Sequence, residues 1–143
     1  MDRNDRLRMK IILCLILILG FLLAFVGCKE EKTTEKKLKD LDFTVLGDNE
    51  IPMELKQIIE ENKHEVAKTT YVDMGELYII VCYGDQPSTG YSIQVNELYE
   101  TENTIAIKTT LKGPSKDEQV LKLVTSPYIV VKLENIEKTV VYK

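Results

Sequence analysis

The segment 77–95, LYIIVCYGDQPSTGYSIQV, consists of two apolar stretches on either side of a loop that contains Gly and Pro. Side chains of a strand alternate between its two faces, and both stretches place apolar residues at every second position. These residues are Leu77, Ile79, Val81 and Tyr83 before the loop, and Tyr91, Ile93 and Val95 after it. The segment therefore predicts two strands joined by the loop at residues 84–90.

The same period of two extends from residue 66 to the C-terminus, with turn residues at short intervals. The turns fall at Glu102-Asn103, Gly113-Pro114, Ser126-Pro127 and Glu134-Asn135. A further short strand is expected at residues 41–46, whereas the stretch 121–124 is too short for a full-length strand. Many short strands separated by turns are typical of an antiparallel sandwich or barrel.

One helix is expected before these strands. Pro52 favours a first helical turn, and Leu55, Ile58 and Ile59 have the spacing of an amphipathic helix that ends near His64. The predicted fold is therefore mainly β (α+β). It is a small antiparallel β-sandwich or open barrel with one amphipathic helix, preceded by a lipoprotein signal peptide whose features follow.

The N-terminus has the composition of a bacterial export signal. Four basic residues within the first ten precede an apolar run at residues 11–26, and Gly27 and Cys28 follow. A basic start, a short apolar stretch and a small residue before the cut are the features of such signals. With Cys28 directly after the cut, the signal resembles that of lipoproteins, in which this Cys receives the lipid. We expect a signal peptide at residues 1–27 and a protein anchored by Cys28 at the extracellular face of the cell membrane.

An uncleaved single-pass anchor is the alternative. A spanning helix needs about 20 apolar residues, whereas the run at residues 11–26 has 16. This length favours the cleaved signal. In both cases the bulk of the chain lies outside the membrane.

Residues 28–40 are predicted to be a charged tether, and residues 41–143 one β-rich domain. Nine of the twelve residues at 29–40 are charged, so this segment cannot bury enough apolar surface to fold. Beyond residue 27 the chain carries 15 basic and 21 acidic side chains. This acidic balance argues against nucleic acid as a partner, since nucleic acid binds basic surfaces.

No pattern of residues indicates catalysis, a metal or a cofactor. The chain has a single histidine, His64, which we place at a solvated helix end. Ser88 lies outside a Gly-x-Ser-x-Gly elbow. Beyond Cys28 the one remaining thiol is Cys82, inside an apolar strand where a buried, inert thiol is expected. We therefore predict a monomer without enzymatic activity, metal or cofactor, in which no disulfide forms within the domain.

The loop at residues 87–91 is the most distinctive internal segment. Pro87 fixes one φ angle, the hydroxyls of Ser88 and Thr89 can satisfy local amides, and Gly90 permits a positive φ. Such a loop is rigid and loses little entropy on binding. We interpret it as a contact surface; a tight connection without a binding role is the alternative.

Three separated segments resemble, in order, the C-terminal domain of the PrcB protease-complex lipoproteins. They are YGDQPSTGYSI at 83–93, LKGP at 111–114 and SPYIVVK at 126–132. The resemblance covers residues 77–143. It implies a small β-rich surface domain that is lipid-anchored and associated with an extracellular protease assembly.

The loop at residues 86–91 is also similar to the first binding loop of chagasin-type inhibitors of cysteine proteases, which are immunoglobulin-like sandwiches. Their second loop is Gly-rich, but here only Gly113 remains beside Pro114. Their third loop has Arg-Pro-Trp, where this chain has Ser126-Pro127-Tyr128 and no Trp at all. A chagasin-like inhibitor is therefore the alternative function.

The function that we predict is binding of an extracellular protein, such as a protease, within or regulating a protease complex. A count of strand reversals places the loops at 87–91 and 126–128 at the same end of the sandwich. Together with two tyrosines they would form a small amphipathic contact surface. The predicted partner-binding residues are Pro87, Ser88, Thr89, Gly90, Tyr91, Ser126, Pro127 and Tyr128.

Overall fold

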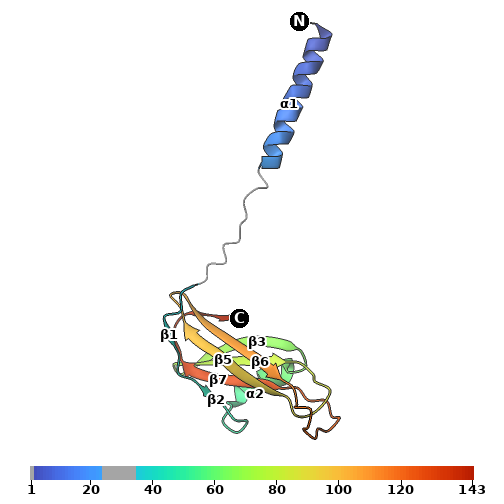
Figure 1. Ribbon diagram of the computed structural model, residues 1–143. Coiled ribbons are helices and arrows are strands. Elements are labelled where there is room, and N and C mark those ends of the chain that lie inside the picture. Colours follow the sequence, from blue (N-terminus) through green and yellow to red (C-terminus); the bar gives the residue numbers. More distant parts are fainter. Residues whose placement is uncertain (1, 24–34) are drawn as a thin grey trace. The chain divides into compact units, whose positions relative to one another are not determined.

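The computed structural model describes residues 2–23 and 35–143, which fall into two compact units divided after Thr34. In the first unit, α1 is a helix at Arg3–Leu23 (Figure 1). In the part of the chain that is described, no helix is long and apolar enough to cross a membrane. The predicted cleavage point and the predicted lipidation residue Cys28 lie outside the described residues.

The second unit consists of two four-stranded sheets and one helix, α2 (Figure 1). The strand order is β1-β5-β6-β8 in the first sheet and β2-β7-β4-β3 in the second. The strands are β1 Lys39–Asp40, β2 Thr44–Val45, β3 Val66–Asp73, β4 Glu76–Tyr83, β5 Ser92–Glu100, β6 Thr104–Lys112, β7 Tyr128–Glu134 and β8 Thr139–Tyr142. Neighbours are antiparallel except for β6 and β8, which are parallel. The predicted mainly β fold is confirmed, and the sheets form an open sandwich.

β4 is buried on both of its faces and separates two cores. Its residues alternate between the core that lies between the sheets and a second core under α2. Leu77, Ile79 and Val81 face the first core, and Tyr78, Ile80 and Cys82 the second. This explains why its sequence is almost continuously apolar, since polar side chains would have no water on either side.

α2, at Met53–Asn62, covers the outer face of the second sheet. Leu55 and Ile59 are almost fully buried there, and a buried aliphatic side chain of this size contributes about 1.5–3 kcal/mol. Pro52 is the residue before the helix rather than its first residue, and the helix ends at Asn62, two residues before His64. The predicted amphipathic helix is thus confirmed, with small differences at both ends.

Contacts within the second unit begin earlier than residue 41, where we expected the domain to start. Lys39 and Asp40, in the expected tether, form β1 and pair with Glu100 and Tyr99 of β5. A two-residue edge strand needs only backbone partners, so a charged sequence can form it. The strand expected at 41–46 is reduced to β2, which pairs with β7.

Candidate functional site

The loops that follow β4 and precede β7 lie side by side at one end of the domain, at the lower right in Figure 1. The Gln86 amide donates to the Thr125 carbonyl at 2.7 Å, and the Thr125 amide donates back at 3.0 Å. The Thr125 hydroxyl also donates to the Ser88 carbonyl at 2.8 Å. Our prediction that these two loops share one end of the sandwich is therefore confirmed.

The hydroxyls at Ser88 and Thr89 hold the loops in shape. The Leu121 amide donates to the Thr89 hydroxyl at 2.9 Å, and the Thr89 amide donates to the Leu121 carbonyl at 3.1 Å. The Ser88 hydroxyl donates to the Thr89 carbonyl at 3.0 Å. Both side chains are half-buried, and Pro87 beside them is exposed. These hydroxyls thus have partners within the protein before any other molecule arrives.

Gly90 is required where the two loops cross. Its φ is +89°, and a Cβ at this position would lie 2.9 Å from Pro114 Cβ and 3.0 Å from Val120 Cγ1. Residues other than Gly rarely adopt this backbone conformation. The loop at residues 113–127, which precedes β7 and is called the second loop below, leaves no room for a side chain here. Gly90 therefore lets residues 113–127 pack directly on the first loop.

The two tyrosines of the predicted contact surface lie apart. The Tyr91 ring covers Gly113, whose added Cβ would lie 3.3 Å from Tyr91 Cε1. Tyr128 begins β7 and packs instead into the core under α2, where its hydroxyl donates to Asp48 Oδ1 at 2.8 Å. Burial, followed by the bond to Asp48, raises the pKa of Tyr128 to about 12. Tyr128 and Val130 are two residues apart on β7, so their side chains lie on the same face of the strand. This is the face that α2 covers.

A polar cluster that the sequence did not predict joins the end of α2 to both loops. Asp85 Oδ1 lies 2.8 Å from His64 Nδ1 and accepts a hydrogen bond of 2.6 Å from the Ser126 hydroxyl. These bonds, that of Ser126 first, hold the pKa of Asp85 below its usual value. The serine donates to the carboxylate and not to the second imidazole nitrogen, so the cluster lacks the arrangement of a catalytic triad. We interpret it as a link that fixes Ser126 in place.

Three aliphatic side chains project from the second loop into solvent, and we call them the aliphatic tip. Leu121, Leu123 and Val124 are 69%, 59% and 63% exposed. They lie within four consecutive residues, at a tight turn in which the Leu123 amide donates to the Leu121 carbonyl at 2.8 Å. Exposed apolar groups that cluster on a fixed loop mark interaction sites. From the sequence we predicted only that the stretch 121–124 is too short for a full-length strand, and we did not identify it as an exposed site.

Comparison with known proteins gives one match. Residues 77–134 match the PrcB C-terminal family. The resemblance stated from three short segments is thereby confirmed, since all three lie within the match. No curated protein and no solved structure matches the chain. The PrcB-like segment extends from β4 to β7 and contains both loops, the aliphatic tip and two of the three side chains of the polar cluster.

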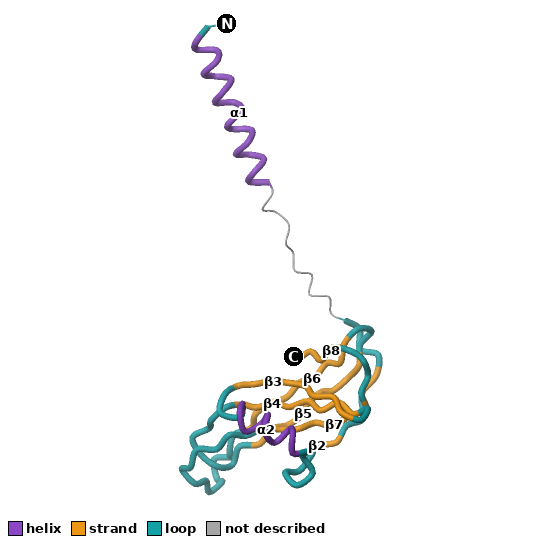
Figure 2. Tube along the Cα trace, turned by 180° about the vertical axis from the view of Figure 1, so that it is seen from behind, coloured by secondary structure: helices purple, strands orange, loops and turns teal. Residues whose placement is uncertain are grey.

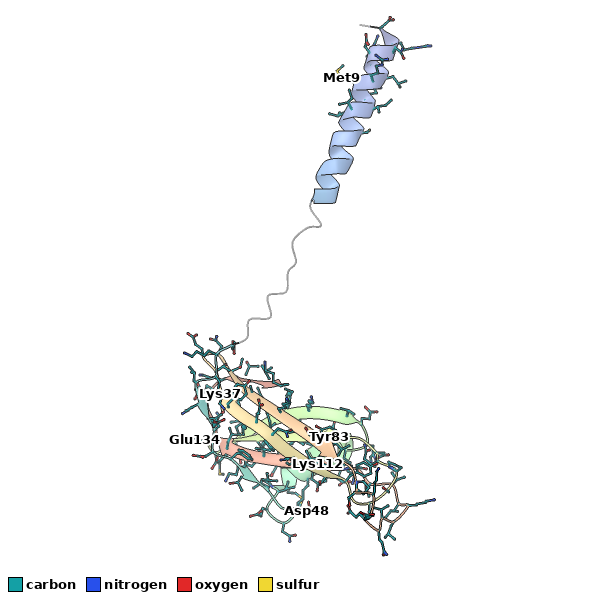
Figure 3. The ribbon with its side chains drawn as sticks, in the orientation of Figure 1. Met9, Lys37, Asp48, Tyr83, Lys112 and Glu134 are labelled. Carbon is teal, nitrogen blue, oxygen red and sulfur yellow. The ribbon has the colours of Figure 1, made fainter. Side chains whose placement is uncertain are left out.

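The chain enters the domain at the end that lies opposite the two loops. The carboxylate of Glu35 accepts hydrogen bonds from the Thr101 hydroxyl, from the Thr104 hydroxyl at 2.8 Å and from Asn103 Nδ2 at 3.2 Å. These bonds, that of Thr101 first, lower the pKa of Glu35. The three partners form the β5–β6 hairpin turn, and the nine residues of β5 separate it from the loops, a distance of about 27 Å. In Figure 3, Lys37 marks the entry end, and Tyr83 and Lys112 lie toward the other.

The described residues hold no group of three or more His, Cys, Asp or Glu side chains that could bind a metal ion. Cys82 is buried, and this burial raises the pKa of its thiol. A nucleophilic thiol needs the opposite shift. The loop end presents exposed aliphatic side chains and hydrogen-bonding groups.

Proposed function

We propose that this chain is a surface lipoprotein without enzymatic activity, whose PrcB-like domain binds an extracellular protein within or regulating a protease complex. A lipid on Cys28 holds it at the extracellular face of the membrane, and the domain binds as a monomer. The observation that carries the proposal is the aliphatic tip, which is exposed on a loop that the rest of the domain holds in place.

The energetics of the tip favour binding. Its three side chains keep well over half of their surface in water, so a partner that covered them would gain about 1–2 kcal/mol for each. The loop is already fixed by its bonds to Gln86, Ser88 and Thr89. A fixed loop loses little conformational entropy on binding, which lowers one of the costs that association must overcome.

The position of the tip also supports the proposal. The chain enters the domain at Glu35, seven residues after the proposed lipidation site at Cys28. The tip lies at the far end of β5 and β6 from this entry point. The tip is thus separated, within the domain, from the residue at which the chain enters it.

Photocrosslinking tests the proposal directly. The full chain, with a photoreactive amino acid in place of Lys122 inside the tip, should form a specific adduct in the intact cell envelope. A probe at Met53, which is 75% exposed on α2, is the matched control and should not form it. The adduct should disappear in the variant Leu121→Ser/Leu123→Ser. Absence of the adduct, or an equal adduct from Met53, would contradict the proposal; a protease or a protease subunit in the adduct would identify the complex.

A further inference from the structure

Within residues 35–143, each sheet ends in a strand with one free edge, and these two strands lie on the same side of the domain. β3 is the last strand of its sheet, and β8 is the last strand of the other. The Tyr142 hydroxyl of β8 donates to the Thr69 carbonyl of β3 at 3.2 Å across the gap. Figure 2 shows β3 and β8 near each other along this open side. An edge strand exposes backbone N–H and C=O groups at alternate residues.

Among the residues that the structure describes, no strand covers the inner face of β3. Lys68, Thr70 and Val72 pair with Val81, Ile79 and Leu77 of β4, so their side chains lie on the face that turns toward the other sheet. Their β4 partners are fully covered by that sheet, whereas all three β3 residues are exposed, Val72 by 53%. The first sheet therefore covers the inner face of β3 less completely than that of β4.

A groove lies along this incompletely covered face of β3. It has a volume of about 670 Å³ and runs between β3 and β8. The side chains that matter for its chemistry are Lys68, Thr70 and Val72 on one side and Thr139, Val140 and Tyr142 on the other. Two edge backbones, a hydrogen-bonding threonine on each side and apolar side chains between them suit an extended polypeptide.

We propose that this groove binds an extended segment of a partner protein, which adds as a strand beside β8 and covers the inner face of β3. The main chain of the segment pairs with the free edge of β8, and every second side chain of the segment contacts Val72 and Val140. This surface uses none of the residues of the aliphatic tip, so it extends the proposed function by a second contact.

The charge of the groove specifies the segment further. The Lys68 ammonium lies 5.2 Å from the centre of the Tyr142 ring, and within the described part of the chain it has no carboxylate partner. Lys138, which also lines the groove, is paired with Glu100 at 2.7 Å. Glu137 is the acidic residue of the lining. Lys68 is therefore the free cation that a carboxylate of the segment meets, and the segment carries an acidic residue at that position.

The test uses a phage-displayed library of random nine-residue peptides as the probe and the full chain, purified in a mild detergent, as the target. Enriched peptides should alternate apolar residues and carry Asp or Glu. Val72→Lys should weaken their binding by about tenfold or more, because it places a charge against the apolar side of the peptide. Met53→Lys introduces the same charge at an exposed apolar residue of α2 and should leave binding unchanged, and equal thermal midpoints of the variants show that the fold is retained.

Two further measurements separate strand addition from other contacts. N-methylation along an enriched peptide should abolish binding at every second position, since only alternate amides face β8. Lys68→Glu should reverse the preference from acidic to basic peptides. No enrichment, binding that Val72→Lys leaves intact, uniform effects of N-methylation, or loss of binding in Leu121→Ser would each overturn the proposal.

Discussion

Replacement of Gly90 by Ala tests whether the two loops are packed as the structure shows. Gly75 provides a matched control, since both glycines have a similar positive φ, +89° and +81°. An added Cβ at Gly75 meets nothing within 4 Å, whereas at Gly90 it lies 2.9 Å from Pro114 Cβ and 3.1 Å from Glu118 Oε1. The difference between the two variants therefore isolates the contact between the loops from the backbone strain that both share.

The magnitudes follow from this geometry. Gly75→Ala should cost about 1–2 kcal/mol, the usual cost of a left-handed backbone for a residue with a Cβ. Gly90→Ala should cost about 1–3 kcal/mol more, as overpacking typically does, because the rigid Pro114 ring cannot move aside as a flexible side chain would. With a typical urea dependence, this difference lowers the unfolding midpoint by about 1 M relative to Gly75→Ala.

Urea unfolding of the full chain, followed by tyrosine fluorescence, measures the effect. All seven tyrosines lie between residues 71 and 142, so the signal reports on the domain and not on α1. Equal midpoints for the two variants would refute the packing of residues 113–127 on Gly90, and with it the view that the aliphatic tip is held in place. A lower midpoint for Gly90→Ala than for Gly75→Ala would support both.

Four shorter predictions follow. The pKa of Asp85 is lowered in the folded state, so its contribution to stability should be present above the unfolded-state value of about 3.9 and be lost as the pH falls through the folded value. Asp85→Asn should accordingly flatten the acid side of the stability profile measured by urea unfolding. Cys28→Ala should abolish incorporation of labelled fatty acid and leave an unprocessed precursor; continued labelling would place the anchor elsewhere. Residues 35–143 contain one thiol, Cys82, so a reducing agent should leave the melting temperature of this fragment unchanged, and the buried thiol should react with a thiol reagent only after unfolding. The chain should not slow papain at equimolar concentration, because the Thr89 hydroxyl already accepts a bond from Leu121; inhibition that Thr89→Arg relieves would favour the chagasin-like alternative.

The strands were predictable because each carries a repeating pattern that one face of a sheet imposes. The β4 residues from Leu77 to Cys82 are apolar at every position because both faces are buried, and the hairpin turn at Glu102-Asn103 has polar residues between two alternating stretches. The loops could be placed at one end because short antiparallel connections leave few other arrangements. The part of the site that depends on this topology was therefore accessible from the sequence.

The contacts that escaped prediction are those that a single side chain makes with a distant segment. Glu35 lies in a charged stretch, and nothing local indicates that its carboxylate binds the turn at Thr104, 69 residues away. His64, Asp85 and Ser126 are likewise far apart in sequence and meet only because the loops are adjacent. Such contacts carry no periodicity, so they become visible only once the fold is known.

The aliphatic tip has apolar residues of the kind found in strands, but residues 121–124 do not form a strand. Within residues 35–143 the stretch 113–127 is the longest connection that contains no helix or strand, and long loops in compact domains usually have a function. Apolar residues at this density would be expected to pack into a core, yet Leu121, Leu123 and Val124 contribute little to either core of the domain and remain in water. The loop is instead held by polar bonds to Thr89 and Ser88, which need no apolar side chain at the tip. Since the fold does not use these three side chains, they are the part of the domain on which our proposal of a protein partner depends.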